Sequence, residues 1–165
     1  MNPPPLLLFD ECIGRPAVRQ LAIFIKELNA DPIPDIRHIL EFQSEGQRDE
    51  EWIPRMAAGG WTVITADRGK GGLRGGEKLP RICAKLGVTH ILLGPSIHSQ
   101  KSADKIISLV AVWPQIIDIS RNKPGTRWRI ATTGKGDEPK KVRIDQIELP
   151  PIDPAPPPGH LFLPG

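Results

Sequence analysis

Three acidic residues stand where apolar segments end or where a helix is expected to begin. Asp10 follows PLLLF, Asp49 heads DEEWI, and Asp67 follows WTVITA. Strands that are apolar almost throughout are typical of a buried parallel sheet, and open α/β sheets place their ligands at the carboxyl ends of such strands. Carboxylate oxygens are the ligands that Mg2+ and Mn2+ prefer. The pattern therefore predicts a divalent-metal site that serves phosphoryl chemistry.

The elements that must position these acids alternate between strand and helix along the chain. Apolar runs predict strands over residues 6–9, 36–42, 61–65 and 89–93. Helical spacing of apolar residues predicts helices from about Arg15 to Leu28 and over 49–58, 77–86 and 103–119. Pro114 is expected to kink the last of these helices. The β-then-α order predicts a three-layer, flavodoxin-like α/β domain with a mostly parallel sheet.

The C-terminal part of the chain has a different pattern. Residues 127–132 and 141–149 alternate apolar and polar side chains around the turn-like TGKGDEPK, which predicts an antiparallel hairpin. The last stretch, PPIDPAPPPGHLFLPG, is too rich in proline for helix or sheet and is expected to be a disordered or polyproline tail. We therefore divide the chain into a domain over 1–120, a hairpin extension over 121–149 and a tail over 150–165.

Composition favours a reduced, water-soluble protein. The 165 residues carry 22 Lys and Arg against 19 Asp and Glu, so the formal charge of +3 is compatible with nucleic-acid binding without requiring it. Cys12 and Cys83 form no CxxC pair, which argues against a disulfide framework and structural zinc. The apolar run near the start lacks a basic segment before it, and no stretch approaches the ~18 apolar residues of a membrane span. We expect a cytoplasmic location.

The motifs LLLFDEC, DEEWI and GWTVITADRG, in this order and spacing, resemble those of PIN-like nucleases, and most closely those of the VapC-type toxin subgroup. In that subgroup a first strand ends in Asp, a helix opens with Asp-Glu-Glu, and the next strand ends in Thr-x-Asp. The later LLGPS and the Trp-Pro of AVWPQII extend the resemblance to about Ile119. The hairpin and the tail lie outside it.

The resemblance implies an endoribonuclease that uses Mg2+ or Mn2+ to hydrolyse RNA phosphodiester bonds, as the toxin of a toxin-antitoxin pair. An antitoxin protein and a second copy of the chain are the partners to be considered. The implied metal ligands are Asp10, Asp49 and Asp67, supported by Glu11, Glu50 and Thr65.

Two departures from the subgroup pattern leave the number of metal ions open. Cys12 stands where relatives often have Asn, and no fourth acid is obvious after Leu93. Asp104 is the candidate substitute. With three carboxylates, one ion is held well, and a second ion would need the substrate phosphate to complete its site.

The glycine-rich segment RGKGGLRGG offers three basic side chains, Arg68, Lys70 and Arg74. Cations on such a loop can grip RNA phosphates without reading sequence, although a solvated loop is an equally good interpretation. The spacing excludes a P-loop because no GK[ST] follows at the required distance.

Two other function classes compete with the nuclease. A receiver-like signalling module could use Asp10, Glu11, Asp67, Ser96 and Lys123, but receivers place their lysine directly after a buried strand, whereas Lys123 follows a predicted helix end. The other alternative is a catalytically silent PIN-like fold that binds a partner through its hairpin and tail.

Overall fold

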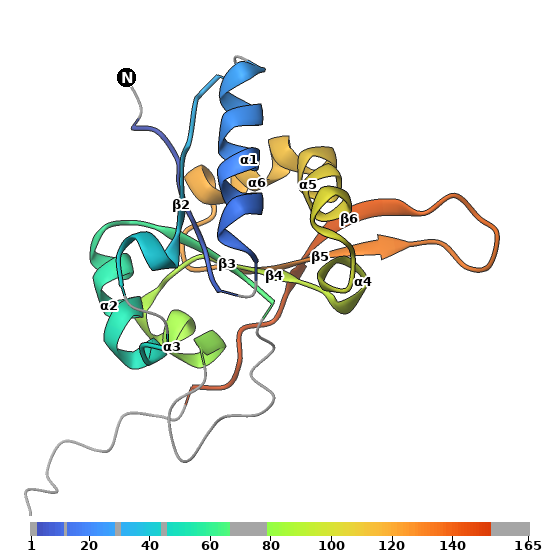
Figure 1. The fold of residues 1–165 in the computed structure, drawn as a ribbon. Helices are drawn as coiled ribbons and strands as arrows, with labels where there is room; N and C mark the ends of the chain where they lie inside the picture. Colours follow the sequence, from blue (N-terminus) through green and yellow to red (C-terminus); the bar gives the residue numbers. More distant parts are fainter. Residues whose placement is uncertain (1–2, 12, 29–30, 44–45, 67–78, 153–165) are drawn as a thin grey trace, which may run out of the picture.

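The computed structural model of the chain describes residues 3–11, 13–28, 31–43, 46–66 and 79–152, which form one sheet between two layers of helices (Figure 1). The sheet has six strands in the order β2-β1-β3-β4-β5-β6. Their bounds are Leu6–Phe9 for β1, Asp35–His38 for β2, Thr62–Thr65 for β3, His90–Leu93 for β4, Arg127–Thr133 for β5 and Lys141–Ile147 for β6.

The first five strands in the chain run parallel, and β6 pairs antiparallel with β5. The three-layer α/β fold with a mostly parallel sheet, predicted from the sequence, is therefore confirmed. Because β1 and β3 are central and apolar on both sides, their carboxyl ends meet at one edge of the sheet. The predicted hairpin is also present, since β5 and β6 pair from Arg127 opposite Ile147 to Thr133 opposite Lys141.

Helices cover both faces of the sheet. One face carries α1 (Arg15–Glu27), α4 (Pro95–His98), α5 (Ser102–Ala111) and α6 (Trp113–Asn122), and the other carries α2 (Asp49–Ala58) and α3 (Leu79–Leu86). Figure 1 shows α1, α5 and α6 on the upper side of the sheet and α2 and α3 on the lower side. Among the described residues, none of these helices has the length and apolar character that crossing a membrane requires.

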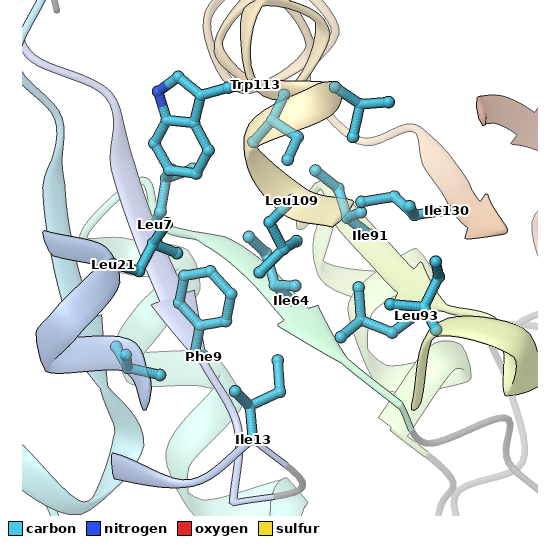
Figure 2. Packing of buried hydrophobic residues seen from close by; sticks show 14 of the residues in the cluster. Leu7, Phe9, Ile13, Leu21, Ile64, Ile91, Leu93, Leu109, Trp113 and Ile130 are labelled. Atoms are coloured by element: carbon cyan, nitrogen blue, oxygen red, sulfur yellow. The ribbon is translucent and has the colours of Figure 1, made fainter. Parts of the chain in front are cut away.

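The larger core lies under α1, α5 and α6. Its helical side chains recur at three- and four-residue spacing, so Val18, Leu21 and Ile25 of α1 face the sheet on one stripe. They meet Phe9 and Ile64, which come from one face of β1 and β3 (Figure 2). This packing fixes the two central strands, and with them the sheet edge at which the candidate acids lie.

The second core lies under α2 and α3. The second core contains Leu8 and Val63, the strand residues that point away from the first core. Trp52 of α2 and Cys83 of α3 belong to the same cluster. Since side chains alternate between the faces of a strand, the residue two positions after Leu8 points to this same face, as does the one two positions after Val63. Those residues are Asp10 and Thr65.

The predicted second strand was too long at its C-terminal end. It ends at His38 because Ile39–Glu41 form a single 3-10 turn that His38 caps. The His38 ring accepts a hydrogen bond from the backbone N–H of Leu40 at 3.2 Å, and the Glu41 carboxylate accepts one from the His38 N–H at 2.8 Å. These side-chain contacts satisfy the backbone groups that continued strand pairing would have used.

The predicted single helix over 103–119 is in fact two helices. Helix α5 ends at Ala111, and α6 begins at Trp113 with Pro114 in its first turn. Proline is well tolerated there because a first-turn N–H has no partner within the helix. The break therefore replaces the predicted kink. The short helix α4 was not predicted, and residues 153–165 of the predicted tail lie outside the described residues.

Candidate functional site

Asp10 is held in a defined orientation directly after β1. Its backbone N–H donates to the carbonyl of Ile64 at 3.0 Å, which extends the pairing with β3 by one residue. One carboxylate oxygen, Oδ2, accepts from the hydroxyl of Thr65 at 3.2 Å, and the other accepts from the Glu11 N–H at 2.6 Å. The side chain is half-buried. A carboxylate is therefore fixed at the carboxyl edge of the sheet.

Thr65 is the residue that positions this carboxylate. It is the last residue of β3 and is completely buried. Its side chain shares a sheet face with Val63, so its hydroxyl approaches Asp10 from the α2 and α3 side. The Thr-x-Asp spacing in the sequence thus has a direct structural use: the threonine orients an acid of the neighbouring strand.

Asp49 is the first residue of α2 and contacts a buried residue of the same helix. Its Oδ1 accepts a hydrogen bond from the indole N–H of Trp52 at 3.0 Å, and Trp52 is 1% exposed. An acid in a first helical turn is also stabilised by the helix dipole. The sequence interpretation did not include the contact with Trp52, although an acid and a tryptophan three residues apart on a helix are neighbours.

The buried thiol of Cys83 responds to both acids. Burial raises its pKa to about 12, assisted by the negative charges of Asp49 and, more weakly, Asp10, while the positive charge of Arg127 acts in the opposite direction. Charges act on a group in this way only over short distances. The contacts of Asp10 with Thr65 and of Asp49 with Trp52 place both carboxylates on the sheet face that α2 and α3 cover.

The supporting acids are placed differently from each other. Glu11 is exposed, and its carboxylate accepts a hydrogen bond from the Gly46 N–H at 3.3 Å, which links the end of β1 to the segment before α2. Glu50 forms an ion pair with Arg48 at 3.6 Å. Asp104 is exposed in the first turn of α5, which packs on the sheet face opposite to Asp10.

Several predicted site residues lie outside the described residues. They are the third candidate ligand, Asp67, and the basic residues Arg68, Lys70 and Arg74. Within the part of the chain that is described, no three acidic, histidine or cysteine side chains converge as a metal cluster. Asp10 and Asp49 carry carboxylate oxygens, which are donors of the kind that Mg2+ and Mn2+ take.

The lysine of the receiver alternative is in the wrong place. Lys123 is the C-cap of α6 and precedes β5 rather than following a strand. Its backbone carbonyl accepts a hydrogen bond from the Thr89 hydroxyl at 3.2 Å, so this residue closes the loop between α6 and β5. Nothing in this arrangement favours a receiver.

The environment of Cys83 predicts an unreactive thiol. With a pKa near 12 and 1% exposure, it is almost entirely protonated at about pH 8, whereas a thiol in an unfolded chain is partly ionised. In a Cys12→Ser background we expect the folded protein to react with DTNB at least about 100-fold more slowly than the urea-unfolded protein. Equal rates before and after unfolding would show that Cys83 is accessible, and would contradict the described packing.

Comparison with known proteins gives one match. Residues 5–69 match the family model described as PIN like domain, a span that is less than half of the chain and includes all three candidate ligands. No curated protein and no solved structure matches the chain. The match supports a PIN-like domain and a nuclease-type fold. It does not reach the VapC-type subgroup, which stays a prediction.

Proposed function

We propose that this protein is a Mg2+- or Mn2+-dependent endoribonuclease that hydrolyses RNA phosphodiester bonds. One observation carries the proposal: Asp10 and Asp49 are each oriented by a hydrogen bond, from Thr65 and from Trp52, on the face of the sheet that α2 and α3 cover. The carboxyl edge of a parallel sheet is where such folds bind their ligands. The family match over residues 5–69 supports the same reaction class.

In this proposal the chain supplies oxygen ligands from Asp10, Asp49 and Asp67. When bound, the divalent ion lowers the pKa of a ligated water and neutralises charge that grows on the phosphate oxygens. Thr65 holds Asp10 in place through its hydroxyl, and Trp52 does the same for Asp49 through its indole N–H. These neutral donors orient the two carboxylates without cancelling their negative charge.

The finer parts of the proposal rest on the resemblance of the three sequence motifs to VapC-type toxins. They are an antitoxin that masks the site and pairing with a second copy of the chain, while the proposed cytoplasmic location rests on the cysteine content. The basic segment with Arg68, Lys70 and Arg74 follows directly on Asp67 in the sequence, which supports a role in gripping RNA phosphates beside the metal.

The test is cleavage of RNA by the purified chain. Structured and single-stranded RNA are each incubated with Mg2+, with Mn2+ or with EDTA, and the products are resolved by length. We expect internal cleavage with either ion and none in EDTA, because the proposed hydrolysis depends on the ion. A copy purified in parallel with Asp10→Asn excludes a contaminating nuclease.

Two results would count against the proposal. Cleavage that persists in EDTA would point to a metal-independent reaction. A folded protein that cleaves neither RNA under any ion would favour the catalytically silent, partner-binding alternative.

A further inference from the structure

The β5–β6 hairpin extends beyond the rest of the sheet. The pairing of β4 with β5 ends at Leu93 opposite Ile130, with one more hydrogen bond of 2.8 Å from the Gly94 N–H to the Ile130 carbonyl. Residues 131–133 of β5 continue past this point paired with β6 (Figure 1), and the Thr132 N–H donates a hydrogen bond to the Ser96 hydroxyl of α4 at 3.0 Å. Because β5 is parallel to β1 and β3, the hairpin projects from the same carboxyl edge that carries Asp10.

The two faces of this hairpin differ in chemistry. On one face Ile130, Val142 and Ile144 pack on the larger core. The opposite face, which we call the open face, alternates with these residues in both strands. Its charged side chains are the basic Arg127, Arg129, Lys141 and Arg143 and the acidic Asp145.

The open face lies on the same side of the sheet as Asp10, with the buried Thr65 and Leu92 between them. Phe9 of β1 is paired with Ile64 of β3, so the next residues, Asp10 and Thr65, are level with each other. Thr65 is in turn paired with Leu92 of β4, and Leu92 with Arg129 of β5. These four residues form one row across the sheet and point to one face. At one strand spacing per step, Arg129 lies roughly 15 Å from Asp10 along that row.

Three of the basic side chains are accessible. Arg129, Lys141 and Arg143 are exposed, and only Arg143 has an ion pair, with Asp145 at 2.8 Å, among the contacts described for these three. The Arg129 side chain lies beside the end of β4: a methyl group added to Gly94 would be 3.7 Å from its Cδ. Arg129 therefore lies on the strand of the hairpin that adjoins β4, and the basic residues on its face outnumber the one acid.

We propose that the open face of the β5–β6 hairpin binds the phosphate backbone of single-stranded RNA and leads it towards Asp10. The inference rests on the proposed function, and it adds a substrate-binding surface outside the matched family region. Arg129 lies in the row that contains Asp10, and the exposed Lys141 and Arg143 lie on the same face of the hairpin. Such side chains suit a polyanion, and they bind phosphates independently of base sequence. An acidic protein segment is the competing occupant.

The test measures binding without cleavage, by the fluorescence anisotropy of a labelled single-stranded RNA in EDTA. The variant carries Arg129→Gln, Lys141→Gln and Arg143→Gln. The matched control carries Arg19→Gln, Lys26→Gln and Arg121→Gln, which removes the same charge from exposed positions of α1 and α6 on the other face of the sheet. Thermal unfolding followed by circular dichroism checks that both variants fold.

We expect the hairpin variant to bind RNA at least about 10-fold more weakly than the unmodified protein, and the control to stay within about twofold. Removing three phosphate contacts also reduces the slope of log affinity against log salt by about 2, at ~0.7 per contact with a single strand. Equal weakening in both variants would show general charge attraction and would overturn the inference. So would undetectable RNA binding by the unmodified protein, or unchanged binding by the hairpin variant, which favours a protein occupant.

The two proposals can fail separately. If the hairpin variant loses RNA binding but the unmodified protein cleaves no RNA with any ion, the hairpin inference stands and the nuclease proposal fails. If the unmodified protein cleaves RNA and the hairpin variant binds it as tightly, the nuclease proposal stands and the inference is wrong.

Discussion

Replacing Asp10 by Asn should lower kcat/KM for metal-dependent RNA cleavage by at least about 100-fold while leaving the protein folded. The substitution removes a negative charge at a proposed metal ligand, and a 100-fold loss corresponds to only about 2.7 kcal/mol of transition-state stabilisation. The amide is nearly the same size as the carboxylate. It can still accept a hydrogen bond from the Glu11 N–H and can donate one to the Thr65 hydroxyl, both of which contact the native side chain.

Matched variants separate this effect from a general loss of charge or stability. Asp118→Asn removes the same charge from an exposed position on α6, where the side chain accepts a hydrogen bond from Asn122, and should leave cleavage unchanged. Thr65→Ser keeps the hydroxyl that orients Asp10, whereas Thr65→Val removes it at nearly constant volume. We expect the valine variant to be the less active of the two. Equal activity of Asp10→Asn and the unmodified protein would remove Asp10 from the site.

The central sheet could be predicted from the sequence because its strands are short apolar runs closed by polar residues. LLLF and the buried TVIT have no alternation, which is typical of strands covered on both sides, and both were predicted within one residue of their bounds. The second strand was harder, because IRHILEF remains apolar through a turn. Only the contacts of His38 and Glu41 with the backbone end that strand, and such contacts have no hydrophobic signature.

The site was predictable in part for the same reason. The buried strand before Asp10 indicates that this acid emerges at an edge, but the role of Thr65 depends on which strand lies beside β1. The open face of the hairpin depends on register even more. The alternation in RWRIATT places Arg127 and Arg129 on a common face, yet only pairing with β4 aligns Arg129 with Asp10. A single sequence does not contain that pairing.

A buried titratable group of the sheet lies away from this edge, at the start of β4. His90 is 1% exposed, and within the described part of the chain neither of its ring nitrogens has a hydrogen-bond partner. Burial first, and then the positive charge of Arg127 on the neighbouring strand, lower its pKa from 6.5 to about 3. The ring is therefore neutral in the folded protein at any pH above about 3, while in the unfolded chain it gains a proton below about 6.5.

This difference makes stability depend on pH in a defined window. Since the unfolded chain binds the extra proton, the contribution of His90 to stability is complete above pH 6.5 and is lost as the pH falls towards 3. At about pH 4.5 the loss should be roughly 2–3 kcal/mol, at 1.36 kcal/mol per pKa unit.

Urea unfolding at pH 7 and pH 4.5 measures this loss of stability. The His90→Leu variant should lack the part of the difference that comes from His90, whereas His98→Gln, at an exposed position of α4, should retain it. Because acidic groups elsewhere also titrate in this range, the comparison between the two variants carries the conclusion. An equal loss of stability in the His90→Leu variant and the unmodified protein would mean that His90 is solvated or paired in the folded state.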